Sequence, residues 1–233
     1  MKTTLLTAFV LHTALVQAQD IGKRPADTPP SPAIAPNADH SLPTPQVDKF
    51  VRNIVLCGRQ AKTTRWLALP RLEITSESPT LKAFVETSFA SISQATGLTT
   101  TGDGVVHVFI GSGRDFLKLE VVRRRKLTMM GKNACHYWQN KDQSLKEAFV
   151  FVKDAPDLTE EYRQHVLFHD LLASFGFMKN SPQFADSTFG TNQAFDIQLS
   201  SLDVKLISFC YRHVPPNAQS SDITKLLKLH WGK

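Results

Sequence analysis

The chain has 233 residues, 42% of them hydrophobic, and a formal net charge of +6 at pH 7. This mild positive excess suits contact with an anionic envelope surface, but it is far from the strongly basic composition of nucleic-acid-binding proteins. The densest basic run, Arg123-Arg124-Arg125-Lys126, has no interleaved aromatic residues that could stack on bases, so we expect no nucleic-acid partner.

The first 18 residues have the pattern of a cleavable signal peptide. Met1-Lys2 is a short basic start, Leu5 to Val16 is mostly apolar, and Val16-Gln17-Ala18 carries small residues where signal peptidase reads. The apolar run is shorter than the roughly 20 residues of a spanning helix. We therefore expect cleavage before Gln19 and an exported protein, periplasmic or extracellular, that does not span a membrane. An uncleaved anchor is the alternative.

Residues 19–46 are predicted to form a flexible linker. Seven of the thirteen prolines of the chain fall there among small and polar residues, and such a segment buries too little apolar surface to order itself. Residues 47–233 are long enough for one hydrophobic core and contain no second linker. We predict that they form a single α+β domain.

The predicted elements of this domain are short strands in its first half and helices around and after them. In chain order they are a helix over Val47–Leu56, a strand over Arg71–Thr75, a helix from Pro79 to Gly97, strands over Val105–Ile110 and Phe149–Val152, a helix over Leu158–Phe175 closed by Gly176, and helices over Leu202–Tyr211 and Ile223–Trp231. Ser200 and Asp203 form a weak capping box before the first of the last two helices. The segment Leu158–Phe175 is the longest clear helical pattern.

Three cysteines follow the predicted cleavage site: Cys57, Cys135 and Cys210. In an oxidising compartment this number favours one disulfide and one remaining thiol, and the spacing matches no zinc-binding motif. Spacing does not choose among the three possible pairs. Cys135, just before a predicted strand and helix, is the cysteine that we most expect to be paired.

The helix over Leu158–Phe175 carries the only chemical signal in the sequence. Its predicted core face consists of Leu167, Phe168, Leu171, Leu172 and Phe175. His165 and His169 are four residues apart on the flank of that face, a spacing at which two imidazoles can reach one metal ion. Asp170 is expected on the polar side, where it is the candidate general base. The alternative interpretation is a pair of helix histidines that only satisfy local hydrogen bonds.

Neither way of aligning this helix with a zinc peptidase motif gives a complete site. If His165 and His169 are the ligands, the general-base position holds Val166, which cannot accept a proton. If His169 is the first ligand and Asp170 the base, the second ligand position holds Ala173. A third ligand would have to come from His107, His136 or Asp203, and the sequence does not select one.

Several segments between Arg65 and Pro216 resemble the bacterial exported family known as domain of unknown function 2927. They are Arg65-Trp66, Ala148–Val152, Asp170–Ser181, Ser187–Phe189, and Leu199–Asp203 running on to Tyr211. That family is similar to zincins, metallopeptidases whose motif lies on a helix under a twisted sheet. The resemblance implies a zincin-like domain with a small twisted sheet on a long central helix. It also implies that His169, Asp170 and Gly176 occupy motif positions, while Ala173 and Lys179 stand where two ligands belong.

Three hypotheses about function follow. The first is an exported zincin-like domain without peptidase activity, which binds a protein or envelope partner and needs no cofactor. The second is a metal-dependent hydrolase with zinc on His165 and His169. The third is a structural or interaction protein in which the helix is simply core. The missing ligands favour the first hypothesis.

Overall fold

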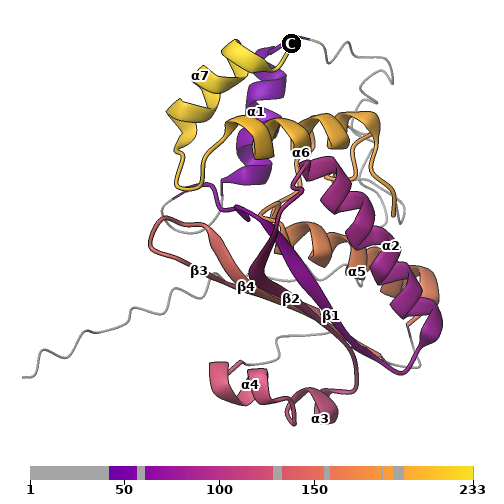
Figure 1. Ribbon diagram of the computed structural model, residues 1–233. Coiled ribbons are helices and arrows are strands. Elements are labelled where there is room, and N and C mark those ends of the chain that lie inside the picture. Colours follow the sequence, from indigo (N-terminus) through magenta and orange to yellow (C-terminus); the bar gives the residue numbers. More distant parts are fainter. Residues whose placement is uncertain are drawn as a thin grey trace, which may run out of the picture.

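The computed structural model describes residues 42–56, 61–127, 133–154, 158–184, 186–190 and 197–232. These residues form a four-stranded mixed sheet with helices on both faces, an α+β fold, as predicted (Figure 1). In chain order the elements are α1 (Pro45–Val55), β1 (Leu69–Ser76), α2 (Pro79–Thr96), β2 (Thr101–Gly111), α3 (Gly113–Phe116), α4 (Glu120–Arg125), β3 (Asn133–Gln139), β4 (Leu145–Lys153), α5 (Glu160–Ser174), α6 (Ser201–His213) and α7 (Ser220–His230).

The strands lie in the order β1-β2-β4-β3. β1 pairs with β2 and β2 with β4 in parallel, whereas β3 runs antiparallel to β4 at one edge. β4 is one of the two inner strands, and every residue from Glu147 to Val152 is buried. A strand that is covered on both faces reads as a continuous apolar run, which is why the sequence Ala148–Val152 signalled it.

One face of the sheet carries the main core, the larger of two clusters of buried apolar side chains. α2 and α5 lie on this face, and α6 packs against α2 (Figure 1). The strands contribute alternate residues to it, among them Val106 and Val108 of β2 and Val150 of β4. Because side chains of a strand alternate between faces, every second residue of the same strands points to the opposite side.

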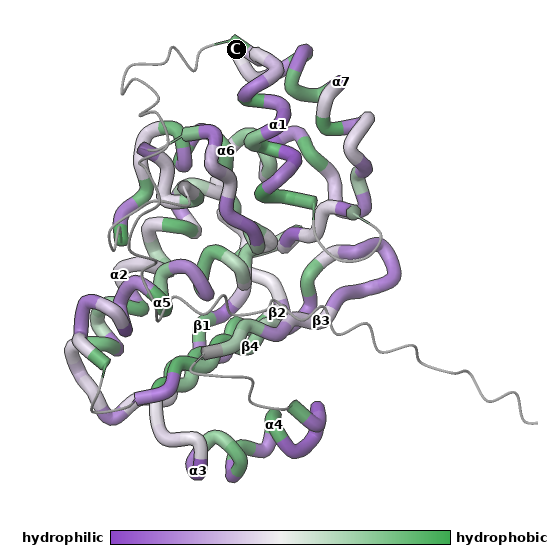
Figure 2. The backbone as a smooth tube through the Cα atoms, turned by 180° about the vertical axis from the view of Figure 1, so that it is seen from behind, coloured by the Kyte–Doolittle hydropathy of each residue, from purple (hydrophilic) through white to green (hydrophobic). Residues whose placement is uncertain are grey.

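The opposite face is covered by a small unit that the sequence did not predict. We call residues 113–127, which contain α3 and α4, the α3–α4 lobe (Figures 1 and 2). Its Phe116, Val122 and Leu127 pack on the sheet residues Phe109, Phe149 and Phe151, and we call these six residues the aromatic cluster. The rings of Phe116 and Phe151 are in close contact, with centroids 4.5 Å apart.

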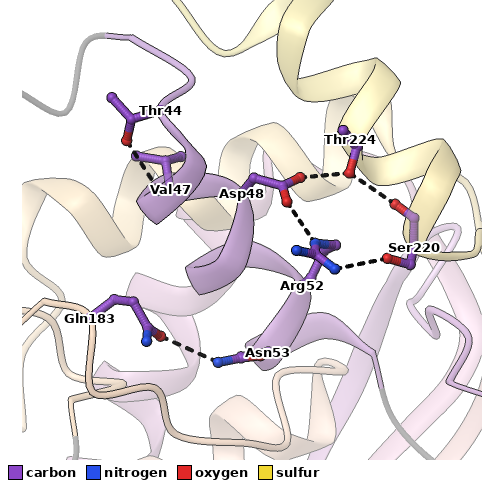
Figure 3. A network of polar contacts seen from close by, with 8 residues as sticks. All are labelled: Thr44, Val47, Asp48, Arg52, Asn53, Gln183, Ser220 and Thr224. Atoms are coloured by element: carbon purple, nitrogen blue, oxygen red, sulfur yellow. Dashed lines mark hydrogen bonds and ion pairs between the residues drawn. The ribbon is translucent and has the colours of Figure 1, made fainter.

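α1 and α7 lie side by side at the end of the molecule opposite the α3–α4 lobe (Figures 1 and 2). A polar network joins them (Figure 3): Asp48 accepts hydrogen bonds from Arg52 and from Thr224, at 2.7 Å each. Arg52 also donates to the hydroxyl of Ser220 at 3.1 Å. The first and last described helices are therefore tied together, although their residues are far apart in sequence.

The start of the domain differs slightly from the prediction. α1 begins at Pro45, two residues inside the predicted linker, because the side chain of Thr44 accepts a hydrogen bond from the backbone N–H of Val47 and caps the helix. Proline fits the first turn of a helix, where its missing N–H costs no hydrogen bond. The signal peptide and the rest of the predicted linker, residues 1–41, lie outside the described residues.

Most other predicted elements are confirmed, but the structure also differs from the prediction. β3, α3 and α4 were not predicted. α5 spans 15 residues and is shorter than α2, which spans 18, so the expectation that α5 is the longest helix is wrong. The capping box before α6 is present, with both Ser200 and Asp203 bonded as expected. None of the helices in the described part of the chain is long and apolar enough to cross a membrane.

The two described cysteines, Cys135 in β3 and Cys210 in α6, are buried free thiols. Burial raises the pKa of both, and nearby Asp170 raises that of Cys135 further. Their thiols therefore stay protonated at neutral pH and are poor nucleophiles. Cys57 lies outside the described residues, so a disulfide that involves it stays a prediction.

Candidate functional site

α5, the helix with the candidate motif, has well-defined ends. The hydroxyl of Thr159 accepts a hydrogen bond from the N–H of Tyr162 at its start, and Gly176 follows its last turn with φ +96°. A side chain at Gly176 would place its Cβ 2.1 Å from the backbone oxygen of Thr64. Glycine is required there both by the backbone conformation and by the approach of Thr64.

The carbonyl groups at the end of α5 are held by side chains from distant segments. Trp66 donates its indole N–H to the carbonyl of Ser174, and Tyr211 donates its hydroxyl to that of Phe175, both at 2.9 Å. Arg65 donates to the carbonyls of Cys210 and Tyr211 near the end of α6. These bonds satisfy carbonyls that a helix end leaves unpaired, and they fix α5 and α6 relative to the 64–66 segment.

His165 and His169 lie in contact on α5, as the spacing predicted. Their ring centroids are 4.5 Å apart with a tilt of 59°, and both side chains are partly buried. Burial, together with the nearby His165, lowers the pKa of His169 to about 4. His169 is therefore neutral at physiological pH, which is the form of imidazole that binds metals.

Asp170 does not lie on the polar side of the helix, contrary to the prediction. Only 8% of it is exposed, and its charge acts on the buried thiol of Cys135 in β3. The reason is that α5 packs against β3 and β4 on one side and α2 on another, so the arc of its surface that is buried is wider than the apolar stripe. Asp170 is therefore buried toward β3 and is not the exposed general base that the sequence predicted.

His107, a candidate third ligand, lies on the opposite face of the sheet from α5. Its neighbours Val106 and Val108 point into the main core, and alternation turns His107 away from it. There its Nδ1 lies 3.0 Å from a carboxylate oxygen of Glu73, and its Nε2 lies 3.4 Å from one of Glu147. The sheet separates His107 from His165 and His169.

His136 is also on the far face. Its neighbours in β3, Cys135 and Tyr137, belong to the main core, while His136 is paired in register with Phe149 of the aromatic cluster. The ring is 5% exposed, and burial lowers its pKa. Within the described part of the chain neither ring nitrogen has a hydrogen-bond partner. It too cannot join the α5 pair.

Asp203, the last candidate ligand, has a structural role at the start of α6. Its fully buried carboxylate accepts hydrogen bonds from the hydroxyl of Ser187 and from the backbone N–H groups of Thr188 and Ser200, the latter two at 2.9 Å. It therefore caps α6 and holds the 187–189 segment against it. Three of the roughly four acceptor sites of this carboxylate are therefore occupied by protein donors.

The positions that the zincin motif assigns to further ligands hold residues unsuited to the role. Ala173 is buried in the main core at 5% exposure, and Lys179 is exposed beyond the end of α5. Among the described residues, no three side chains of His, Cys, Asp or Glu are grouped so that they could hold a metal ion. Within the part of the chain that the structure describes, no third such side chain is thus grouped with His165 and His169.

Sequence reasoning missed a charged network on the far face of the sheet. Glu147, 11% exposed at its side chain, accepts hydrogen bonds from both Arg124, at 2.9 Å, and Arg125 of α4. The guanidinium of Arg125 also lies over the ring of Trp138, 4.7 Å from its centroid. The available signal was Glu147, a charged residue directly before the apolar run Ala148–Val152 of β4. Two of the four residues in the basic run Arg123–Lys126 thus pair with the sheet, so the run does not face solvent as a whole.

Comparisons with known proteins add nothing to this geometry. No protein-family model matches the sequence, and no characterised protein or solved structure was found to match it. The resemblance to the domain of unknown function 2927 family stays a prediction from the motifs in the sequence.

Proposed function

We propose that the chain is an exported zincin-like domain without peptidase activity that binds a protein or envelope partner. The arrangement of α5 supports the zincin-like part: the helix directly follows the central strand β4 and packs under one face of the sheet beside α2. Export rests on the predicted signal peptide, Met1 to Ala18. Mass spectrometry of the exported protein should give Gln19 as its first residue, and an intact Met1 or Lys2 would contradict export by this route.

The metal-ligand side chains around α5 are the observation that supports the proposed lack of peptidase activity. A catalytic zinc site needs three protein ligands, an open fourth position and a nearby base. Among the described residues, none of the three candidates can be the third ligand of His165 and His169, since His107 and His136 lie beyond the sheet and Asp203 caps α6. Asp170, the remaining candidate base, is buried toward β3.

Several residues that carry the family resemblance stabilise the described fold. Trp66 and Tyr211 hold the end of α5, Gly176 admits the backbone of Thr64, and Asp203 caps α6. A shared pattern made of such residues supports a shared fold without a shared reaction. This favours a binding module built on a zincin-like scaffold.

The alternative is a metal-dependent hydrolase that uses His165 and His169, and one observation favours it. The two rings are in contact on successive turns, and the low pKa of His169 keeps that imidazole available to a metal at neutral pH. Its third ligand would have to come from a partner molecule or from outside the described residues.

One experiment separates the two functions: zinc content and chelator-sensitive peptidase activity of the purified mature protein. The variants His165→Ala and His169→Ala are compared with His230→Ala, a histidine on α7 far from the pair. We expect zinc well below one equivalent and no activity that a chelator abolishes. One equivalent of zinc, together with activity lost in both α5 variants and kept in His230→Ala, would establish the hydrolase instead.

A further inference from the structure

The α3–α4 lobe concentrates positive charge at one end of the molecule. Residues 113–126 contain six Lys and Arg and two Asp and Glu, a net charge of +4, within a chain whose total is +6. The lobe projects from the face of the sheet opposite α2 and α5, so its outer side lies away from the rest of the domain (Figures 1 and 2).

Some of these cationic side chains bind the sheet, and others are exposed to solvent. Arg124 and Arg125 pair with Glu147, and Lys118 pairs with Asp115 at 2.8 Å. Three cations, Arg114, Arg123 and Lys126, are exposed and form no ion pair with any other residue that the structure describes.

The same lobe exposes an apolar side chain. Leu117 is 60% exposed, and in the sequence it follows Arg114 by three residues and directly precedes Lys118, which are both exposed. The preceding Phe116 is fully buried in the aromatic cluster and anchors the turn that presents Leu117. Exposed leucine flanked by long cationic side chains is the combination that favours the interface of an anionic bilayer.

We propose that the α3–α4 lobe docks on an anionic lipid bilayer, with its cations on the lipid phosphates and Leu117 in the headgroup region. This inference names the partner of the envelope-binding function proposed above and rests on it. Charge complementarity selects the lipid surface, and Leu117 favours it over a soluble polyanion, which offers no apolar layer.

α7 provides a matched comparison within the same chain. It also exposes two lysines, Lys225 and Lys228, and a leucine, Leu229, at 54%. With Asp222 its net charge is only +1, and it lies at the opposite end of the molecule from the lobe (Figure 1). A membrane that the lobe contacts would leave α7 well beyond the screening length of about 8–10 Å.

The test is co-sedimentation of the mature protein with vesicles of phosphatidylglycerol and phosphatidylcholine in equal parts, against vesicles of phosphatidylcholine alone. The charge variant Arg114→Ser/Arg123→Ser/Lys126→Ser should bind anionic vesicles on the order of a hundredfold more weakly than the original protein. Arg114→Lys/Arg123→Lys, which keeps the charge, should bind normally. Leu117→Ser should weaken vesicle binding without changing binding to dextran sulfate.

The α7 variant Lys225→Ser/Lys228→Ser/Leu229→Ser is the control and should change vesicle binding by less than about twofold. Equal losses in the lobe and α7 variants would overturn the proposal, as would no preference for anionic vesicles. Binding to dextran sulfate without binding to vesicles would also overturn it and assign the lobe to a soluble polyanion. Zinc-dependent peptidase activity with intact vesicle binding would refute only the proposed lack of enzymatic function.

Discussion

The two faces of the sheet are stabilised in different ways. The main core joins strands from the whole sheet to α2, α5 and α6, and side chains from distant segments fix the helix ends. On the far face the α3–α4 lobe rests on the six residues of the aromatic cluster and on the ion pairs of Glu147. Loss of contacts on the first face should therefore unfold the domain, whereas loss on the second should release only the lobe.

The largest expected effect is on the main-core side, at Gly176. Gly176→Ala places a Cβ 2.1 Å from the carbonyl oxygen of Thr64 at φ +96°, so we expect a loss of about 4 kcal/mol in the free energy of unfolding. Gly97→Ala is the matched control, since Gly97 also ends a helix at positive φ but has no atom within 4 Å of the added Cβ. It should lose about 1 kcal/mol by urea denaturation. Equal losses would contradict the role of Thr64.

The next effect concerns the far face. Phe116→Ala removes the ring that contacts Phe149 and Phe151, at a cost of about 3 kcal/mol in the attachment of the lobe. Hydrogen exchange should become fast in residues 113–127 while α5 stays protected. Leu117→Ala, at an exposed neighbouring position, should leave both unchanged. Loss of protection throughout the domain would show that the two faces unfold together.

A third effect is the pH dependence that His169 gives to the main-core side. The pKa of His169 in the folded protein is about 4 against an ordinary 6.5, so the unfolded chain takes up the proton first as the pH falls. The contribution of His169 to stability is therefore full well above pH 6.5 and decreases toward pH 4, by on the order of 3 kcal/mol. His169→Gln should flatten this part of the curve of unfolding free energy against pH. An unchanged slope would assign the dependence to other groups.

The smallest expected effect is at Glu147. Glu147→Gln keeps the shape but removes the charge that holds Arg124 and Arg125, and we expect about 1–2 kcal/mol of weaker lobe attachment, because Arg124 is largely exposed. Asp154→Asn, which removes an exposed partner of Arg163, should cost less than about 1 kcal/mol. Faster hydrogen exchange in residues 113–127 of Glu147→Gln, but not of Asp154→Asn, would support separate release of the lobe from the far face of the sheet.

The candidate site was predictable only in part. The contact of His165 with His169 follows from the helical repeat, because residues four apart lie one above the other. The burial of Asp170 does not, since it depends on β3, a strand without a clear signal in the sequence, passing beside α5. In the same way the position of His136 depends on the register of β3 against β4.

The sequence by itself determined the elements that local rules govern. Signals at helix ends act within one or two turns, so they can be predicted directly from the sequence. They are proline and Ser78 at the start of α2, glycine after α2 and α5, and the Ser200–Asp203 box before α6. Tertiary structure decided which side chains meet. The sheet separates His107 from the α5 histidines and places it next to Glu147. This contact depends on the pairing of strands some 40 residues apart in the sequence, and local sequence patterns do not predict which strands pair.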